Sequence, residues 1–101
     1  MTAPNGDLYL AYGDRVTRLR RRERPVALAP NQHDVDQLEF DGCGRLWSAG
    51  ETVHVLENGV WLHVAQAPAH SRVKWTDSAR LPTGVALADS TKVVRIERAC
   101  P

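Results

Sequence analysis

Histidine and cysteine are the side chains with which this sequence could hold a metal ion or act as a nucleophile. The four histidines show neither H-x-x-x-H nor H-E-x-x-H spacing, the patterns that bring two zinc ligands together on a helix. Cys43 lies in the segment Asp-Gly-Cys-Gly-Arg, where glycines suit a tight turn, so the fold would have to supply the partners of a catalytic triad. No nucleophile elbow, phosphate-binding loop or dinucleotide fingerprint occurs. We therefore expect no catalytic residue, no metal ion and no cofactor; the histidines considered are His33, His54, His63 and His70.

Four acids gather before the middle of the chain, and paired carboxylates can bind Ca²⁺ or act as acid and base. Asp34 and Asp36 would share one face of an extended strand, because side chains alternate between the two faces. The segment lacks the glycine turn and closing glutamate of a calcium loop, so we interpret it as a polar strand face that meets a basic surface. The acids are Asp34, Asp36, Glu39 and Asp41, of which the first three are candidate protein-binding residues.

A run of arginines follows an apolar segment near the N-terminus. Guanidinium groups bind phosphates or acidic protein surfaces, but such a run can also be a solvated strand end that keeps a sheet edge from pairing. Nucleic-acid binding usually adds exposed aromatic side chains, whereas the pattern around Tyr9 and Tyr12 suits burial. The functional hypothesis is a protein or anion site, with nucleic acid the less favoured ligand. Its candidate residues are Arg18, Arg20, Arg21, Arg22 and Arg24.

Three tryptophans, Trp47, Trp61 and Trp75, follow one another at intervals of 14 residues. They could form an aromatic platform for a sugar or a peptide. The alternative is that the rings pack between sheets, where burial of each contributes a few kcal/mol. We favour packing and keep the platform as a candidate ligand site.

The formal net charge of +1 hides a segregation of charge along the 101 residues. Residues 1–30 carry +3, residues 31–60 carry −5 and residues 61–101 carry +3, which favours a specific protein surface over a polyanion. No apolar run approaches the ~20 residues that span a bilayer, and the N-terminus lacks the regions of a secretory signal. We expect one globular domain in a reducing cytoplasm, away from membranes, with Cys43 and Cys100 as free thiols.

Short apolar runs punctuated by Gly, Pro, Asn and Asp indicate an all-β fold, and no stretch shows helical periodicity. Asn58-Gly59 between two apolar runs is a strong hairpin signal, because both turn residues tolerate positive φ. The expected strands are 8–12, 15–19, 26–28, 35–41, 45–49, 52–56, 60–65, 72–75, 84–88 and 92–97.

Some of these strands repeat. Segment 8–19 aligns with segment 45–56 at a shift of 37 residues, and segment 84–96 matches them after a small turn insertion. The sequence Asp-Gly-Cys-Gly-Arg-Leu-Trp at 41–47, followed by Val-His-Val-Leu-Glu-Asn-Gly-Val-Trp at 53–61, resembles a blade of tectonin-type and two-component-regulator β-propellers. The resemblance implies antiparallel meander sheets and carries no active site with it.

The expected strands divide into three, four and three, in repeat units of roughly 7–30, 35–66 and 71–98 within a single domain, 1–101. A closed propeller needs at least four blades. Two chains could close a ring as a homodimer, or three as a homotrimer. Otherwise the sheets would pack as a small sandwich or barrel, or another protein would cover the exposed strand edges.

The lack of catalytic motifs, the open strand edges and the segregated charge favour a non-enzymatic protein-binding module. A chain of this size would suit a small bacterial or phage-encoded inhibitor, such as an immunity protein or an antagonist. One alternative is a glycan-binding lectin that oligomerises into a propeller. The other is a nucleic-acid or anion binder that acts through the arginine run 18–24.

Overall fold

The computed structural model describes residues 1–12, 15–28, 35–66 and 74–101, and within them it contains strands and no helix. The all-β prediction is therefore confirmed. No helix in these ranges is long and apolar enough to cross a lipid bilayer. The strands are β1 (Leu8–Tyr12), β2 (Arg15–Leu19), β3 (Val26–Ala27), β4 (Val35–Phe40), β5 (Leu46–Gly50), β6 (Thr52–Glu57), β7 (Val60–Gln66), β8 (Asp77–Leu81), β9 (Gly84–Ala88) and β10 (Val93–Glu97).

The strands form three antiparallel sheets, each of which follows the chain order without a crossover. Sheet A is β1-β2-β3, sheet B is β4-β5-β6-β7 and sheet C is β8-β9-β10, so the expected division into three, four and three strands is confirmed. Local turn chemistry sets these hairpins. Asn58 and Gly59, with φ of 51° and 76°, form the two-residue turn that the register of β6 and β7 requires.

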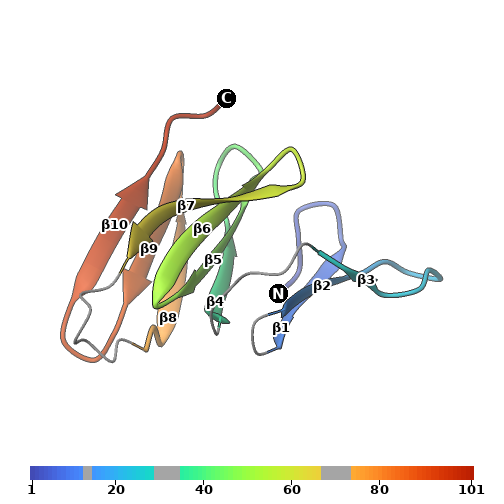
Figure 1. Ribbon diagram of the computed structural model, residues 1–101, viewed down its shortest axis with the longest axis horizontal. Coiled ribbons are helices and arrows are strands. Elements are labelled where there is room, and N and C mark those ends of the chain that lie inside the picture. The colour runs from blue at the N-terminus through green and yellow to red at the C-terminus, as the bar shows by residue number, and fades with distance from the viewer. Residues whose placement is uncertain (13–14, 29–34, 67–73) are drawn as a thin grey trace.

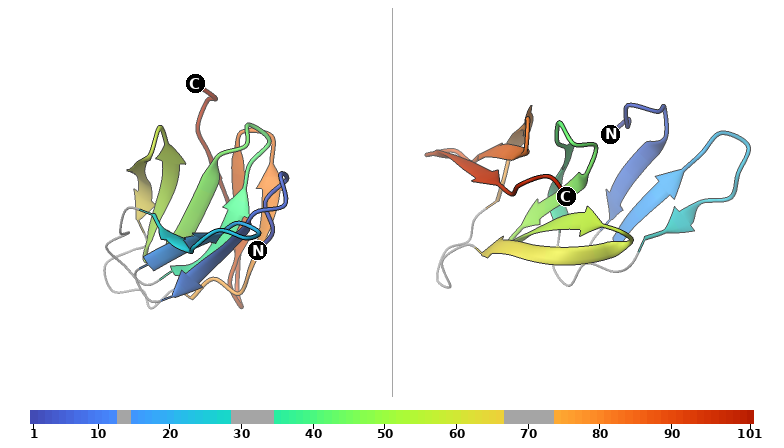
Figure 2. Two further views of the ribbon diagram at one scale, coloured as in Figure 1. Left: turned by 90° about the vertical axis from the view of Figure 1, so that its right-hand side faces the viewer. Right: turned by 90° about the horizontal axis from the view of Figure 1, so that it is seen from above.

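The three sheets stand side by side along the molecule, with sheet B in the middle (Figure 1). The first strand of sheet B, β4, lies against β1 of sheet A and β8 of sheet C. Seen from above, the sheets fan out from these first strands, and β3, β7 and β10 lie at the periphery (Figure 2). Sheet B therefore has a neighbour on each face, whereas sheets A and C each have one.

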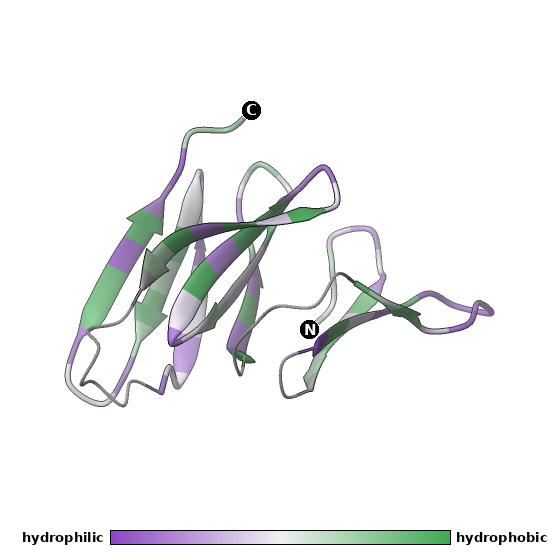
Figure 3. Cartoon of the chain, viewed as in Figure 1, coloured by the Kyte–Doolittle hydropathy of each residue, from purple (hydrophilic) through white to green (hydrophobic). Residues whose placement is uncertain are grey.

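The core follows from this arrangement. On one face of sheet B, Trp47 and Val55 pack with Val85 and Leu87 of sheet C. On the other face, Phe40 and Leu46 cluster with Val16 of sheet A and with Ala3. Every residue of β5 is buried, whereas burial alternates along β10, whose ribbon carries both hydrophobic and hydrophilic segments in Figure 3. The end sheets consequently expose one face each.

One expected strand is wrong. Residues 72 and 73 lie outside the described part of the chain, and 74–75 form no strand; sheet C instead begins with β8, four residues after Val73. Trp75 is a core anchor and not a ladder residue, since its Nε1–H donates to the Gly50 carbonyl at 2.9 Å. The sequence of β8, Asp-Ser-Ala-Arg-Leu, is polar and so gave no strand signal. A first strand with one exposed face needs few apolar residues.

Candidate functional site

The candidate functional site is the connection between β2 and β3, residues 20–25, which we call the arginine loop. All six of its residues are exposed. The loop turns tightly, with the Glu23 N–H donating to the Arg20 carbonyl at 3.1 Å, and Arg22 occupies the left-handed region with φ of 64°. An arginine is an unusual residue for this backbone conformation, which favours glycine or asparagine. The sequence thus places a cation where turn geometry alone would select another residue.

The arginines of the loop differ in what they contact. The Arg20 Nε–H donates to the Asp7 carboxylate at 2.9 Å, and this hydrogen bond holds the pKa of Asp7 below its ordinary value. Arg21, Arg22 and Arg24 form no ion pair with any residue that the structure describes. These three guanidinium groups are available to an acidic ligand.

Arg18 belongs to the interior of sheet A and not to the loop. It lies on the same face as its cross-strand neighbours Tyr9 and Val26, and the Tyr9 ring packs edge-on against Phe40 of sheet B at 5.2 Å between centroids. The Arg18 Nε is buried and has no hydrogen-bond partner within the described ranges. The run predicted from the sequence is therefore divided between a partly buried arginine and an exposed loop.

The acids expected to form a binding surface make hydrogen bonds within the molecule where the structure describes them. Asp34 lies outside the described residues. Asp36 sits at a β-bulge in β4, and its carboxylate accepts the Trp75 N–H at 3.1 Å. Glu39 accepts a hydrogen bond from the Ser78 hydroxyl at 3.1 Å. These acids thus join β4 to sheet C and its preceding segment.

Two of the three tryptophans are buried and so cannot form the candidate platform. Trp47 and Trp75 are 1% and 6% exposed, and both pack in the core between sheets B and C. The Trp47 Nε1–H donates to Asp41 at 2.8 Å. Trp61 is half-buried and packs against the cluster between sheets A and B. Rings that fill the space between sheets cannot stack on a sugar, so packing prevails at Trp47 and Trp75.

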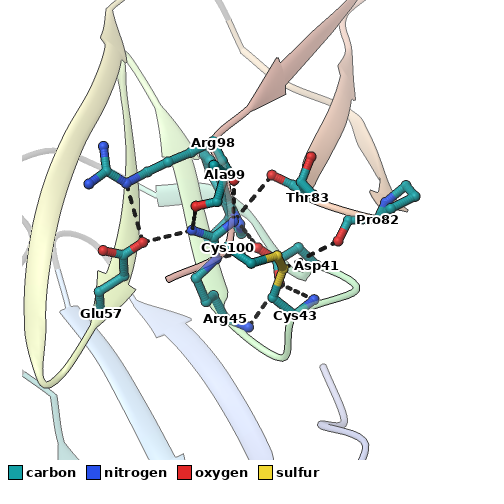
Figure 4. The surroundings of a disulfide bond; sticks show 10 residues. Asp41, Cys43, Arg45, Glu57, Pro82, Thr83, Arg98, Ala99 and Cys100 are labelled. Atoms are coloured by element: carbon teal, nitrogen blue, oxygen red, sulfur yellow. Dashed lines mark hydrogen bonds and ion pairs between the residues drawn. A yellow bond between two sulfur atoms is a disulfide. The ribbon is translucent and has the colours of Figure 1, made fainter.

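Sequence reasoning missed the most connected group of polar side chains, centred on Arg45 (Figure 4). Its guanidinium uses all of its donors: Nε on the Asp41 carboxylate at 2.7 Å, and Nη1 on Glu57 at 2.7 Å. The remaining N–H groups donate to three backbone carbonyls, those of Thr83, Arg98 and Ala99. One buried arginine therefore ties sheet B to sheet C and to the C-terminal segment. The signal that could have revealed it is an arginine four residues after an aspartate in a tight turn.

Asp41 is the other organiser of this group and is 1% exposed. Its carboxylate accepts the backbone N–H groups of Cys43 and Arg45, at 2.8 and 2.9 Å, besides the side chains of Arg45 and Trp47. Burial alone would raise the pKa of Asp41, but these hydrogen bonds outweigh burial and hold the pKa below its ordinary value. A carboxylate so fully occupied is a structural group and not an acid–base catalyst.

The cysteines are paired, which corrects the expectation of two free thiols. Cys43 and Cys100 form a disulfide with Cα atoms 6.1 Å apart, within the ordinary range for such bonds (Figure 4). The sequence could not show this, because the pairing depends on the C-terminal segment returning to the β4–β5 turn. Arg45 holds that segment there through the carbonyls of Arg98 and Ala99.

The histidines that the structure describes form no metal centre. The rings of His54 and His63 lie 5.4 Å apart on neighbouring strands, while His33 and His70 fall outside the described ranges. No group of three or more potential metal ligands occurs among the described side chains.

Comparison with protein-family models, curated proteins and solved structures finds no match to this chain. The resemblance to propeller blades stays a prediction.

Proposed function

We propose that this chain is a non-enzymatic protein-binding module whose arginine loop binds an acidic surface of another protein. The observation that supports this is the exposure of Arg21, Arg22 and Arg24 at the tip of a hairpin that projects from one end of the molecule (Figure 1). Val26, 41% exposed, follows the loop directly. Arginine is enriched among the residues that contribute most of the binding energy in protein–protein interfaces.

Two features favour a protein ligand over a nucleic acid. The Phe, Tyr and Trp side chains whose burial the structure describes are all buried or half-buried, which leaves little of their ring surface for bases to stack on. Acids also lie among the cations: Asp7 pairs with Arg20, and Glu23 stands within the loop. Such mixed charge repels a continuous phosphate backbone more than it repels a protein surface with scattered carboxylates.

Charge reversal of the loop tests this function. In the variant Arg21→Glu/Arg22→Glu/Arg24→Glu, like charges would face the acidic partner, and we expect at least a 100-fold loss of affinity. The wild type and the variant would be compared by quantitative affinity purification after nuclease treatment, and then by titration of each protein recovered.

The matched control is Lys74→Glu/Arg80→Glu/Lys92→Glu, which reverses three exposed cations away from the loop and should leave binding of the same proteins unchanged. The wild type would also be tested for binding to an unrelated 20-nucleotide single strand. If it bound this strand as tightly as it binds the recovered proteins, and the loop variant did not, the loop would be assigned to nucleic acid instead. Equal recovery of the same proteins by all three chains would refute the proposal.

The single variant Arg22→Gly separates charge from turn stability. Glycine adopts positive φ without the cost of about 1–2 kcal/mol that other residues bear, so we expect Arg22→Gly to be at least as stable as the wild type. The urea midpoint measures this directly. A variant that is more stable and yet binds its partner more weakly would show that Arg22 serves recognition; a marked loss of stability would mean that its side chain supports the fold.

A further inference from the structure

The two end sheets expose apolar faces that no described segment covers. On sheet A, Tyr9 and Val16 face sheet B, so Leu8, Leu10 and Leu19 lie on the outer face, where Leu8 and Leu10 are 37% and 44% exposed. On sheet C, Val85 and Leu87 face sheet B. Alternation then puts Ala79, Ala86, Ala88 and Val93 on the outer face, where Val93 is 70% exposed.

These two faces differ in shape in a way that fits them to each other. The outer face of sheet A presents branched leucine side chains. The outer face of sheet C presents small alanines and contains a shallow hollow of about 120 Å³, lined by β8, β9 and Val93. A space of this order admits a compact hydrocarbon group, since a cavity of about 150 Å³ holds benzene. Projecting leucines on one face can therefore fill the hollow in the other.

The charges at the margins agree with the same pairing. Arg15 is exposed on the outer face of sheet A, beyond the leucines. The outer face of sheet C carries Asp77 and Glu97, both exposed, and one cation, Arg95, which pairs with Glu97 at 3.3 Å. The outer face of sheet A therefore carries a net positive charge and the outer face of sheet C a net negative one.

Within one chain the two faces cannot meet, because sheet B separates sheets A and C (Figures 1 and 2). We propose that the outer face of sheet A docks on the outer face of sheet C of a second copy of this chain. A twofold axis then forms this contact twice and closes six sheets into a ring, which leaves no such face uncovered. The inference is independent of the proposed function, because the arginine loop lies outside both faces.

The expected strength follows from the size of the faces. With strands about 4.8 Å apart and roughly 3.3 Å per residue, each face covers about 200 Å². Two such contacts bury on the order of 800–1,000 Å², below the usual size of a stable interface, about 1,200–2,000 Å². We therefore expect a dimer that dissociates on dilution.

Sedimentation equilibrium between about 1 μM and 1 mM chain tests the proposal over the range in which weak dimers form. We expect the mean mass to rise from the 11.2 kDa of one chain towards twice that value. Leu10→Asp and Ala79→Asp each place a charge in a contact and should each keep the chain monomeric throughout. Both residues are exposed in the single chain, so the variants should fold, which tryptophan fluorescence would verify.

The matched control is Ser90→Asp, which adds the same charge at the exposed β9–β10 turn and should leave association unchanged. A mixture of Leu10→Asp and Ala79→Asp keeps one unaltered pair of faces and should associate weakly. The proposal is overturned if the wild type stays at the mass of one chain at 1 mM, if it reaches three chains, or if only one of the two variants prevents association, which would indicate a self-complementary face.

Discussion

Replacing Asp41 with asparagine is expected to lower the free energy of unfolding by about 3–5 kcal/mol, the usual cost of removing one partner from a buried ion pair. The asparagine amide has about the same size as the carboxylate but leaves the buried Arg45 guanidinium with one of its two carboxylate partners, Glu57. It would also present N–H donors to groups that themselves donate to Asp41. Domains of this kind are stable by only about 5–15 kcal/mol, so the loss is large. Urea denaturation followed by tryptophan fluorescence measures it.

The pH dependence gives an independent check on this prediction. Because the folded state holds the pKa of Asp41 below its ordinary value of 3.8, the unfolded chain binds the proton more readily. The stabilisation is therefore present above about pH 4 and is lost as the pH falls further. This part of the acid sensitivity should be missing in Asp41→Asn. Glu97→Gln, at an exposed pair, should change stability by less than about 1 kcal/mol; a similar cost at both positions would contradict the role assigned to Asp41.

Removing the disulfide should have an effect of similar size. The bond joins residues 57 positions apart, and for a loop of this length the loss of unfolded-state entropy corresponds to about 4 kcal/mol. We expect Cys100→Ser to lower the free energy of unfolding by this amount. The same shift should appear when the wild type is unfolded in the presence of a reductant.

The double variant Cys43→Ser/Cys100→Ser serves as the control, because a single cross-link can be lost only once. It should be no less stable than Cys100→Ser alone, and a reductant should leave it unaffected. Thiol titration of the unreduced, denatured wild type should find no reactive cysteine. Two reactive thiols, or a urea midpoint that a reductant does not move, would show that the bond does not form in solution.

The hairpins could be predicted from the sequence because local chemistry determines them. Asn58-Gly59 specifies a two-residue turn, and apolar runs of four to seven residues fix the neighbouring strands to within about a residue. The strand at 77–81 could not be predicted, since its polar sequence depends on pairing with β9. Among the candidate site residues, the exposed arginines of the loop followed from composition, whereas the inward placement of Arg18 depended on which face of sheet A meets sheet B.

The contacts between the sheets could not be predicted from the sequence. Arg45 aligns with Leu8 in the repeat, so nothing local indicates that its donors reach Glu57 and the carbonyls of residues 83, 98 and 99. The contact of Asp36 was equally hidden: it lies at a bulge in β4, and its carboxylate accepts the Trp75 N–H, while Asp34 lies outside the described residues. Such long-range contacts depend on the sheet order, which strand patterns do not encode.

The position of the disulfide divides the chain into two units, one held together by a covalent cross-link and one held by packing alone. The covalent loop from Cys43 to Cys100 encloses β5 to β10, so the strands of sheet C and most of sheet B remain joined even when their packing loosens. Sheet A lies outside that loop and is held by side-chain packing around Phe40 and Leu46. Local unfolding should therefore begin with sheet A, which detaches as a unit while the cross-linked remainder keeps its core. The amide hydrogens of β1 and β2 should then exchange with solvent before those of β5 and β9.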